Sequence, residues 1–226
     1  MKLTFPLSLG MVAVLTAVLC QNAAAQAAQT PAAPSTDAQS RESKGVPPRA
    51  APGDYQGHAQ AGAVTVAAEF TGHSVVTSEA LLTTEDYVVV EVGLYGPPET
   101  RLKLSYADFS VRINGKKAPV MAEEYNAVFA SLKDPEWEPP DAAEKKSKTS
   151  VGGSGKSEGS LPPIVHVPIE LKRAMQLRVQ KASLPEGERP LPAAGLIFFP
   201  HRGKNIQSIE LLYSGPAGKA AVTLHP

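Results

Sequence analysis

The stretch that decides the fold spans residues 86–95 and reads Asp86-Tyr87-Val88-Val89-Val90-Glu91-Val92-Gly93-Leu94-Tyr95. Successive side chains of an extended chain point to opposite faces, so the valines at even positions share one face. The opposite face is also largely apolar, because it carries Tyr87, Val89 and Tyr95. A strand that is apolar on both faces belongs in the middle of a sheet. Gly96-Pro97-Pro98 then ends the strand, since proline cannot continue a ladder.

The same alternation, with a period of two, recurs on both sides of this segment. It predicts further strands over residues 63–70, 101–105, 108–113, 196–199, 207–213 and 219–224. Asn114-Gly115 is the strongest short signal of a hairpin, since both residues tolerate positive φ. We therefore expect a return strand over residues 116–120, and we expect the last two strands of the chain to form an antiparallel pair.

Two helices are expected to interrupt the strands. Residues 121–132 place apolar side chains on one stripe, and Glu123 and Glu124 fall in the first turn, where the helix dipole favours negative charge. Residues 168–182 also show an apolar stripe, and Pro168 suits the first position of a helix. Both helices would belong to an insertion in the β fold.

Two segments lack the large apolar side chains that a core needs. Residues 26–53 are mostly Ala, Gln, Pro, Ser and Thr, which predicts a disordered stalk. Residues 134–163 are rich in Pro, Gly, Ser and Lys, which predicts a flexible insertion. The stretches 54–133 and 164–226 must then share one core, because neither holds enough strands for two sheets.

These elements predict a mainly β fold, with one domain over residues 54–226. We expect an Ig-like antiparallel β-sandwich with a two-helix, partly disordered insertion, since turn signals recur at roughly the 8–12-residue spacing of sandwiches. Residues 86–92, 108–117 and 209–213 resemble strings in exported bacterial Ig-like β-sandwich domain proteins of unknown function. This resemblance concerns the fold and implies no catalytic residues.

Residues 1–25 have the layout of a secretory signal peptide. Met1-Lys2 is positive, an apolar stretch covers residues 5–20, and Ala23-Ala24-Ala25 offers an A-x-A cleavage site. The apolar stretch is 16 residues long, whereas a membrane-spanning helix needs about 20. We expect an exported protein, periplasmic or extracellular, without a membrane span.

Cys20 is the only cysteine of the chain and lies inside this signal. Its lipidation is the alternative to cleavage after Ala25. Bacterial lipoprotein signals usually place a small residue before the cysteine, and Leu19 stands there, which favours cleavage. The mature chain then has no disulfide and no thiolate metal site.

The chain gives little sign of cofactor, metal or nucleic-acid chemistry. It has 22 basic and 22 acidic residues, so nothing electrostatic favours nucleic acid as a partner. Gly152–Ser157 ends like a phosphate-binding loop, but Ser150 stands where that loop needs its first glycine. The histidines show no metal-binding spacing; they are His58, His73, His166, His201 and His225. We expect no catalytic residue, no metal site and no cofactor.

Trp137 is the only tryptophan and stands in an acidic, proline-bounded segment. Exposed tryptophan is a common anchor of interfaces. The alternative is that Trp137 folds back and covers a sheet edge or a helix end. We take Trp137, together with Lys145, Lys146 and Lys148, as the predicted binding surface for another envelope protein or polymer.

The sequence therefore favours an exported, non-enzymatic binding or structural module of the bacterial envelope. Two alternatives remain open. A hydrolase of envelope polymers would need two or more carboxylates in one concave site, and the available ones are Glu69, Glu91, Asp108 and Glu210. A strand-adding assembly or chaperone-like domain would need a long unpaired edge strand.

Overall fold

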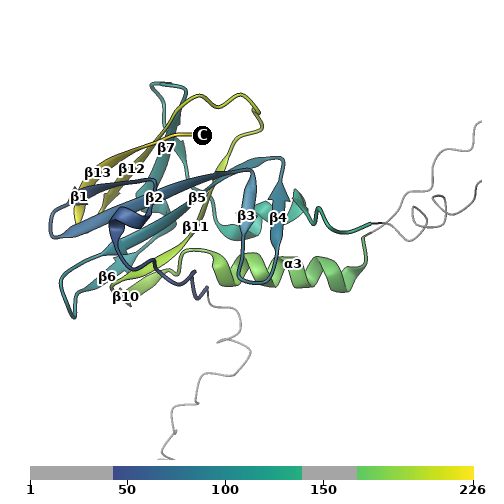
Figure 1. Ribbon diagram of the computed structural model, residues 1–226, viewed down its shortest axis with the longest axis horizontal. Coiled ribbons are helices and arrows are strands. Elements are labelled where there is room, and N and C mark those ends of the chain that lie inside the picture. Colours follow the sequence, from purple (N-terminus) through teal and green to yellow (C-terminus); the bar gives the residue numbers. More distant parts are fainter. Residues whose placement is uncertain (1–42, 139–166) are drawn as a thin grey trace, which may run out of the picture. The chain divides into compact units, whose positions relative to one another are not determined.

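The protein is mainly β, with antiparallel sheets, in the computed structural model, which describes residues 43–138 and 167–226 (Figure 1). The first sheet has the order β1-β2-β5-β11. Its strands are β1 (Gly57–Ala61), β2 (Val64–Gly72), β5 (Tyr87–Tyr95) and β11 (Ala193–Pro200). The second sheet has the order β13-β12-β7-β8. Its strands are β7 (Phe109–Ile113), β8 (Val120–Met121), β12 (Ile209–Gly215) and β13 (Gly218–Leu224).

Two smaller sheets and four short or medium helices complete the described part. One small sheet has the order β3-β4-β9, and β10 pairs with β6 in the other. These strands are β3 (Ser74–Val76), β4 (Leu81–Thr84), β6 (Arg101–Leu104), β9 (Leu132–Lys133) and β10 (Gly187–Pro190). The helices are the 3-10 turns η1 (Pro52–Asp54), η2 (Tyr106–Asp108) and η3 (Tyr125–Ala130), and the α-helix α3 (Ile169–Ala182).

β5 is a central strand, as its sequence predicts. It pairs antiparallel with β2 on one side and with β11 on the other. Alternate side chains from Val88 to Leu94 enter the core shared with the second sheet, whereas Val89 enters a second core on the opposite face. Burial on both sides explains why this segment is apolar on both faces.

The main core lies between the two four-stranded sheets. It is built from alternate side chains of β2, β5 and β11 on one side and of β7, β12 and β13 on the other. Phe109 and Tyr213 meet in it with ring centroids 5.1 Å apart. Residues from before and after the 139–166 segment line this core, so distant stretches of alternating sequence form one interior.

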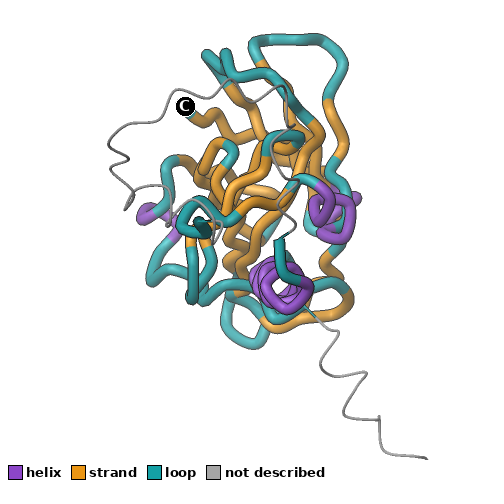
Figure 2. Tube along the Cα trace, turned by 90° about the vertical axis from the view of Figure 1, so that its right-hand side faces the viewer, coloured by secondary structure: helices purple, strands orange, loops and turns teal. Residues whose placement is uncertain are grey.

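α3 covers the opposite face of the first sheet, and Figure 2 views this helix along its axis. Met175 and Val179 of α3 pack in the second core with Val89 of β5 and Phe198 of β11. The helix predicted over residues 168–182 is confirmed, and it begins directly after Pro168.

The helix predicted over residues 121–132 is wrong, and so is most of the return strand over 116–120. The chain at this point pairs with both large sheets instead. The Ala122 N–H donates to the Phe109 carbonyl (3.2 Å), and the Glu123 N–H donates to the Phe198 carbonyl (2.9 Å). Only η3 is helical there. Strand pairing thus satisfies the backbone groups that a helix would have satisfied, and Met121 is exposed.

The Asn114-Gly115 turn is confirmed, with φ of 54° and 67°. Five strands were not predicted, namely β1, β3, β4, β9 and β10. The predicted stalk over 26–53 is also too long, because residues 43–53 lie against the first sheet: the Val46 N–H donates to the Ala194 carbonyl (3.1 Å). The rest of that stalk and the predicted signal peptide lie outside the described residues.

The only cysteine of the chain is Cys20, so no intrachain disulfide can form. Within residues 43–138 and 167–226, no helix combines the length and the apolar character that crossing a membrane requires.

Candidate functional site

Trp137 lines an apolar pocket of about 240 Å³ at the N-terminal half of α3. The strand β9 leads into this segment, and a turn follows in which the Trp137 N–H donates to the Asp134 carbonyl (3.2 Å). The turn brings the half-buried indole back toward the helix. The pocket is lined by Leu132, Lys133, Asp134, Trp137, Val167, Leu171 and Met175.

Trp137 lies at the end of a helix, and its role as a binding anchor stays a prediction. The indole folds back against the end of a helix, which the alternative predicted, but it leaves an open pocket beside it. Lys133 at the rim is held by Glu85, whose carboxylate lies 2.5 Å from the lysine Nζ. The hydrogen bond and charge of Lys133 lower the pKa of Glu85. The rim of the pocket is therefore charged and its lining is mainly apolar.

The other predicted binding residues, Lys145, Lys146 and Lys148, lie outside the described residues. So does Gly152–Ser157. The structure thus places one of the four predicted contact residues, and it places that residue at a pocket.

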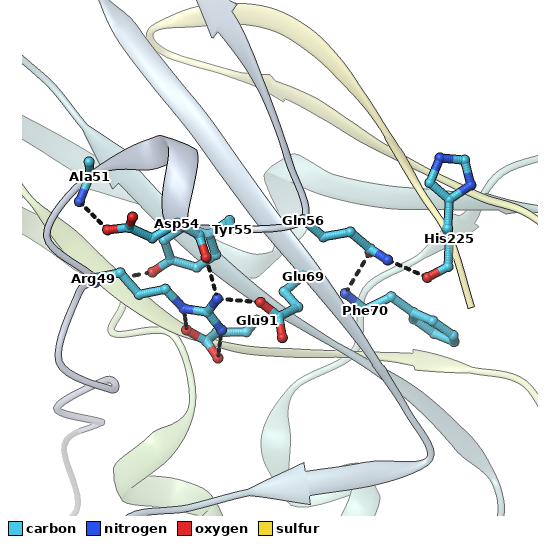
Figure 3. A network of polar contacts seen from close by, with 9 residues as sticks. All are labelled: Arg49, Ala51, Asp54, Tyr55, Gln56, Glu69, Phe70, Glu91 and His225. Atoms are coloured by element: carbon cyan, nitrogen blue, oxygen red, sulfur yellow. Dashed lines mark hydrogen bonds and ion pairs between the residues drawn. The ribbon is translucent and has the colours of Figure 1, made fainter.

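Arg49 is the centre of a polar cluster on the outer face of the first sheet (Figure 3). Glu69 of β2 and Glu91 of β5 are direct cross-strand partners. Arg49 Nε and Nη2 donate to the two carboxylate oxygens of Glu91 (3.3 and 3.2 Å), and Nη1 forms an ion pair with Glu69. One guanidinium therefore bridges two carboxylates that would otherwise repel each other.

Aromatic rings complete this cluster. The Arg49 guanidinium lies over the Tyr55 ring, 4.4 Å from its centroid, and the Tyr95 hydroxyl donates to the Arg49 carbonyl (2.8 Å). Burial opposes the charge of Arg49, but the hydrogen bonds that it donates to Glu69 and Glu91 outweigh this effect and raise the pKa of Arg49. Burial and the neighbouring Tyr55 raise the pKa of the Tyr95 phenol. The cluster fixes residues 49–55 to the sheet.

The other two carboxylates considered for catalysis lie elsewhere. Glu210 on β12 accepts a hydrogen bond from Arg112 (3.0 Å) on the neighbouring β7. Asp108 lies next to Tyr213, and burial raises the pKa of the Asp108 carboxyl. Only Glu69 and Glu91 are brought together, and Arg49 binds both of them.

In the described ranges, little supports a metal site or an edge strand open to a partner strand. No group of three or more His, Cys, Asp or Glu side chains there is placed to hold a metal ion. The outer edge of β11 is covered by three backbone hydrogen bonds: Val46 to Ala194 (3.1 Å), Leu184 to Leu196 (3.0 Å) and Glu123 to Phe198 (2.9 Å). β13 carries Lys219 and lies beside β1. These strands do not offer a long free edge.

Comparison with known proteins finds no relative: no protein family, no curated protein and no solved structure matches the chain. The site must therefore be interpreted from its own geometry.

Sequence reasoning missed Arg49 because the segment around it was assigned to the stalk by composition. A signal was present in the same segment. Val46, Arg49 and Tyr55 interrupt the run of small residues, and Glu69 and Glu91 both fall on the outward positions of their predicted strands. Two carboxylates on neighbouring strands predict a nearby cation, but the strand order was needed to see that they are neighbours.

Proposed function

We propose that the protein is an exported, non-enzymatic binding module of the bacterial envelope, built as an Ig-like β-sandwich. Two antiparallel sheets that share one core support the sandwich. The layout of residues 1–25 supports export. The partner is another envelope protein, and it is bound through the pocket at Trp137.

The observation that carries this proposal is the open, mainly apolar pocket beside the only tryptophan. Its volume of about 240 Å³ suits one large apolar side chain. Trp137, Leu171 and Met175 provide the polarisable and aliphatic contacts that such a side chain needs. Lys133 and Asp134 at the rim provide polar contacts that orient the partner backbone.

The hydrolase alternative is less well supported by the same structure. A pair of catalytic carboxylates needs separated protonation states and access to substrate. Glu69 and Glu91 both form ion pairs with the same arginine, Arg49. Both carboxylates are therefore occupied in holding residues 49–55 on the sheet.

The test is site-specific photo-crosslinking in the envelope of an exporting bacterium. A photoreactive amino acid replaces the exposed Glu136, next to the pocket, in the full chain. We expect a discrete crosslinked partner that is lost in Trp137→Ala and retained in Trp137→Phe, because phenylalanine keeps an aromatic wall. Equal melting temperatures of the two variants control for folding. Unchanged crosslinking of Trp137→Ala would refute the site.

A further inference from the structure

A second pocket lies where three segments distant in sequence meet. Residues 44–49, the β3–β4 turn around residues 76–79 and the last turns of α3 surround a volume of about 450 Å³. The ion pair between Arg178 Nε and Glu79 (3.0 Å) joins α3 to the turn, and Figure 1 shows β3 and β4 beside α3. This pocket is distinct from the one at Trp137, since the two share no lining residue.

The aliphatic part of this pocket is accessible. Val46, Val76 and Ala182 contribute to its lining. Val76 is 47% exposed, which makes it one of the few large apolar side chains of the described residues that remain open to solvent. The lining contains no aromatic residue; it consists of Lys44, Gly45, Val46, Pro47, Arg49, Val76, Thr77, Ser78, Glu79, Glu91, Arg178, Lys181 and Ala182.

The charges of the lining do not balance. Its two carboxylates are each taken by an arginine: Glu91 by Arg49 (3.2 Å) and Glu79 by Arg178 (3.0 Å). The remaining cations are lysines. Lys181 Nζ is 4.0 Å from Glu79, at the limit of an ion pair, and Lys44 has no ion pair within residues 43–138 and 167–226. The pocket thus presents two lysine charges without a close carboxylate of their own.

We infer that this pocket binds an acidic peptide segment of a partner protein. A glutamate or aspartate of the segment pairs with Lys44 and Lys181, and an adjacent aliphatic side chain lies on Val46 and Val76. The Ser78 hydroxyl has no hydrogen-bond partner in the described chain, and it is available to the peptide backbone. Charge complementarity and an accessible aliphatic surface together select this occupant.

The residue types favour a peptide over an acidic polysaccharide. Sugar rings are commonly recognised by stacking on aromatic faces, and the lining has none. Aliphatic side chains such as Val46 and Val76 instead suit valine, leucine or isoleucine next to the acid. The inference does not depend on the Trp137 pocket, because the two surfaces have different residues and different chemistry.

The test measures the affinity of fluorescent pentapeptides for the full-length mature chain by polarisation. The probes are acetylated and amidated, with one or two glutamates between aliphatic residues, and each has a glutamine-for-glutamate counterpart. We expect glutamate peptides to bind, and we expect roughly tenfold weaker binding to the double variant Lys44→Ala/Lys181→Ala, from the loss of two partly exposed charge pairs. The control Lys172→Ala/Lys219→Ala changes the net charge equally at exposed positions outside the pocket.

Binding should also weaken as salt rises from about 50 to 500 mM, since the lysines are exposed to solvent. Equal binding of glutamate and glutamine peptides would overturn the inference. So would equal losses in the pocket and control double variants, or binding of uronic-acid oligosaccharides in place of every peptide. A circular dichroism spectrum and melting temperature like those of the parent protein show that each variant is folded.

Discussion

Replacing Arg49 by methionine tests how residues 43–55 are held on the first sheet. The change removes the guanidinium but keeps an unbranched side chain. It leaves Glu69 and Glu91 directly opposite each other across β2 and β5, with side chains 35% and 14% exposed. It also removes the contact with the Tyr55 ring.

The expected cost can be estimated from three contributions. Leaving a partly buried hydrogen-bonding group unsatisfied costs about 1–3 kcal/mol. Like charges placed opposite each other on neighbouring strands cost about 0.2–1 kcal/mol, and the lost cation–π contact about 0.5–1 kcal/mol. We therefore expect Arg49→Met to lower the free energy of unfolding by about 2–4 kcal/mol, which is a large part of the stability of an ordinary domain.

The assay is urea unfolding followed by circular dichroism, with the midpoint compared at equal slope. The double variant Arg49→Met/Glu91→Gln should recover part of the loss, because one of the two facing charges is then neutral. The matched control is Arg112→Met, which breaks a more exposed pair with Glu210 (side chains 42% and 38% exposed) and should cost less than about 1 kcal/mol. Equal costs for Arg49→Met and Arg112→Met would refute the reasoning.

Two further predictions concern single positions. A Cβ at Gly93 would lie 2.7 Å from Tyr55 Cζ, so Gly93→Ala should destabilise the protein by about 1–3 kcal/mol. The control Gly53→Ala has open space around the added Cβ and should leave the stability unchanged. Equal melting temperatures of the two variants would contradict this prediction. Burial, with help from nearby Lys116, lowers the pKa of His201 below 6.5. Its protonation is therefore less favourable in the folded state, and stability is lost as the pH falls through the unfolded pKa of about 6.5. Urea titrations between about pH 7 and pH 5 should show the parent protein losing more stability than His201→Gln. As a control, His58→Gln, at an exposed position, should have the same pH profile of stability as the parent. Parallel pH profiles of the parent and His201→Gln would contradict the prediction.

Alternation of side chains predicted the two large sheets well, because burial of one or both faces leaves a direct trace in the sequence. β5, β7, β12 and β13 all fall where the pattern places them. The small strands β3 and β4 left no such trace. They are three and four residues long, which is too short for an alternation of side chains to repeat.

The failure at residues 121–132 has a different cause. An apolar stripe can be buried by a helix or by irregular chain that pairs with neighbouring strands, and local sequence does not separate the two. The backbone of Ala122 and Glu123 bonds to strands far away in sequence. Tertiary pairing thus overrode the local helical pattern.

The sequence predicts the pockets less well than it predicts the fold. Trp137 was recognised as unusual because it is the only tryptophan and lies between prolines. The side chains that complete its pocket, Leu171 and Met175, come from a helix after the 139–166 segment. No local pattern links Lys44 with Lys181. Such pairs depend on the path of the chain between them.

The proposed binding role is tested most directly by the fluorescence of Trp137. Because it is the only tryptophan of the chain, the emission that remains after subtracting the same titration of the Trp137→Phe variant comes from this pocket. When the crosslinked partner is purified and titrated into the full chain, we predict a shift of the emission to shorter wavelength that saturates with binding, as the half-buried indole becomes covered. Binding of the partner with no change in Trp137 emission would contradict the account.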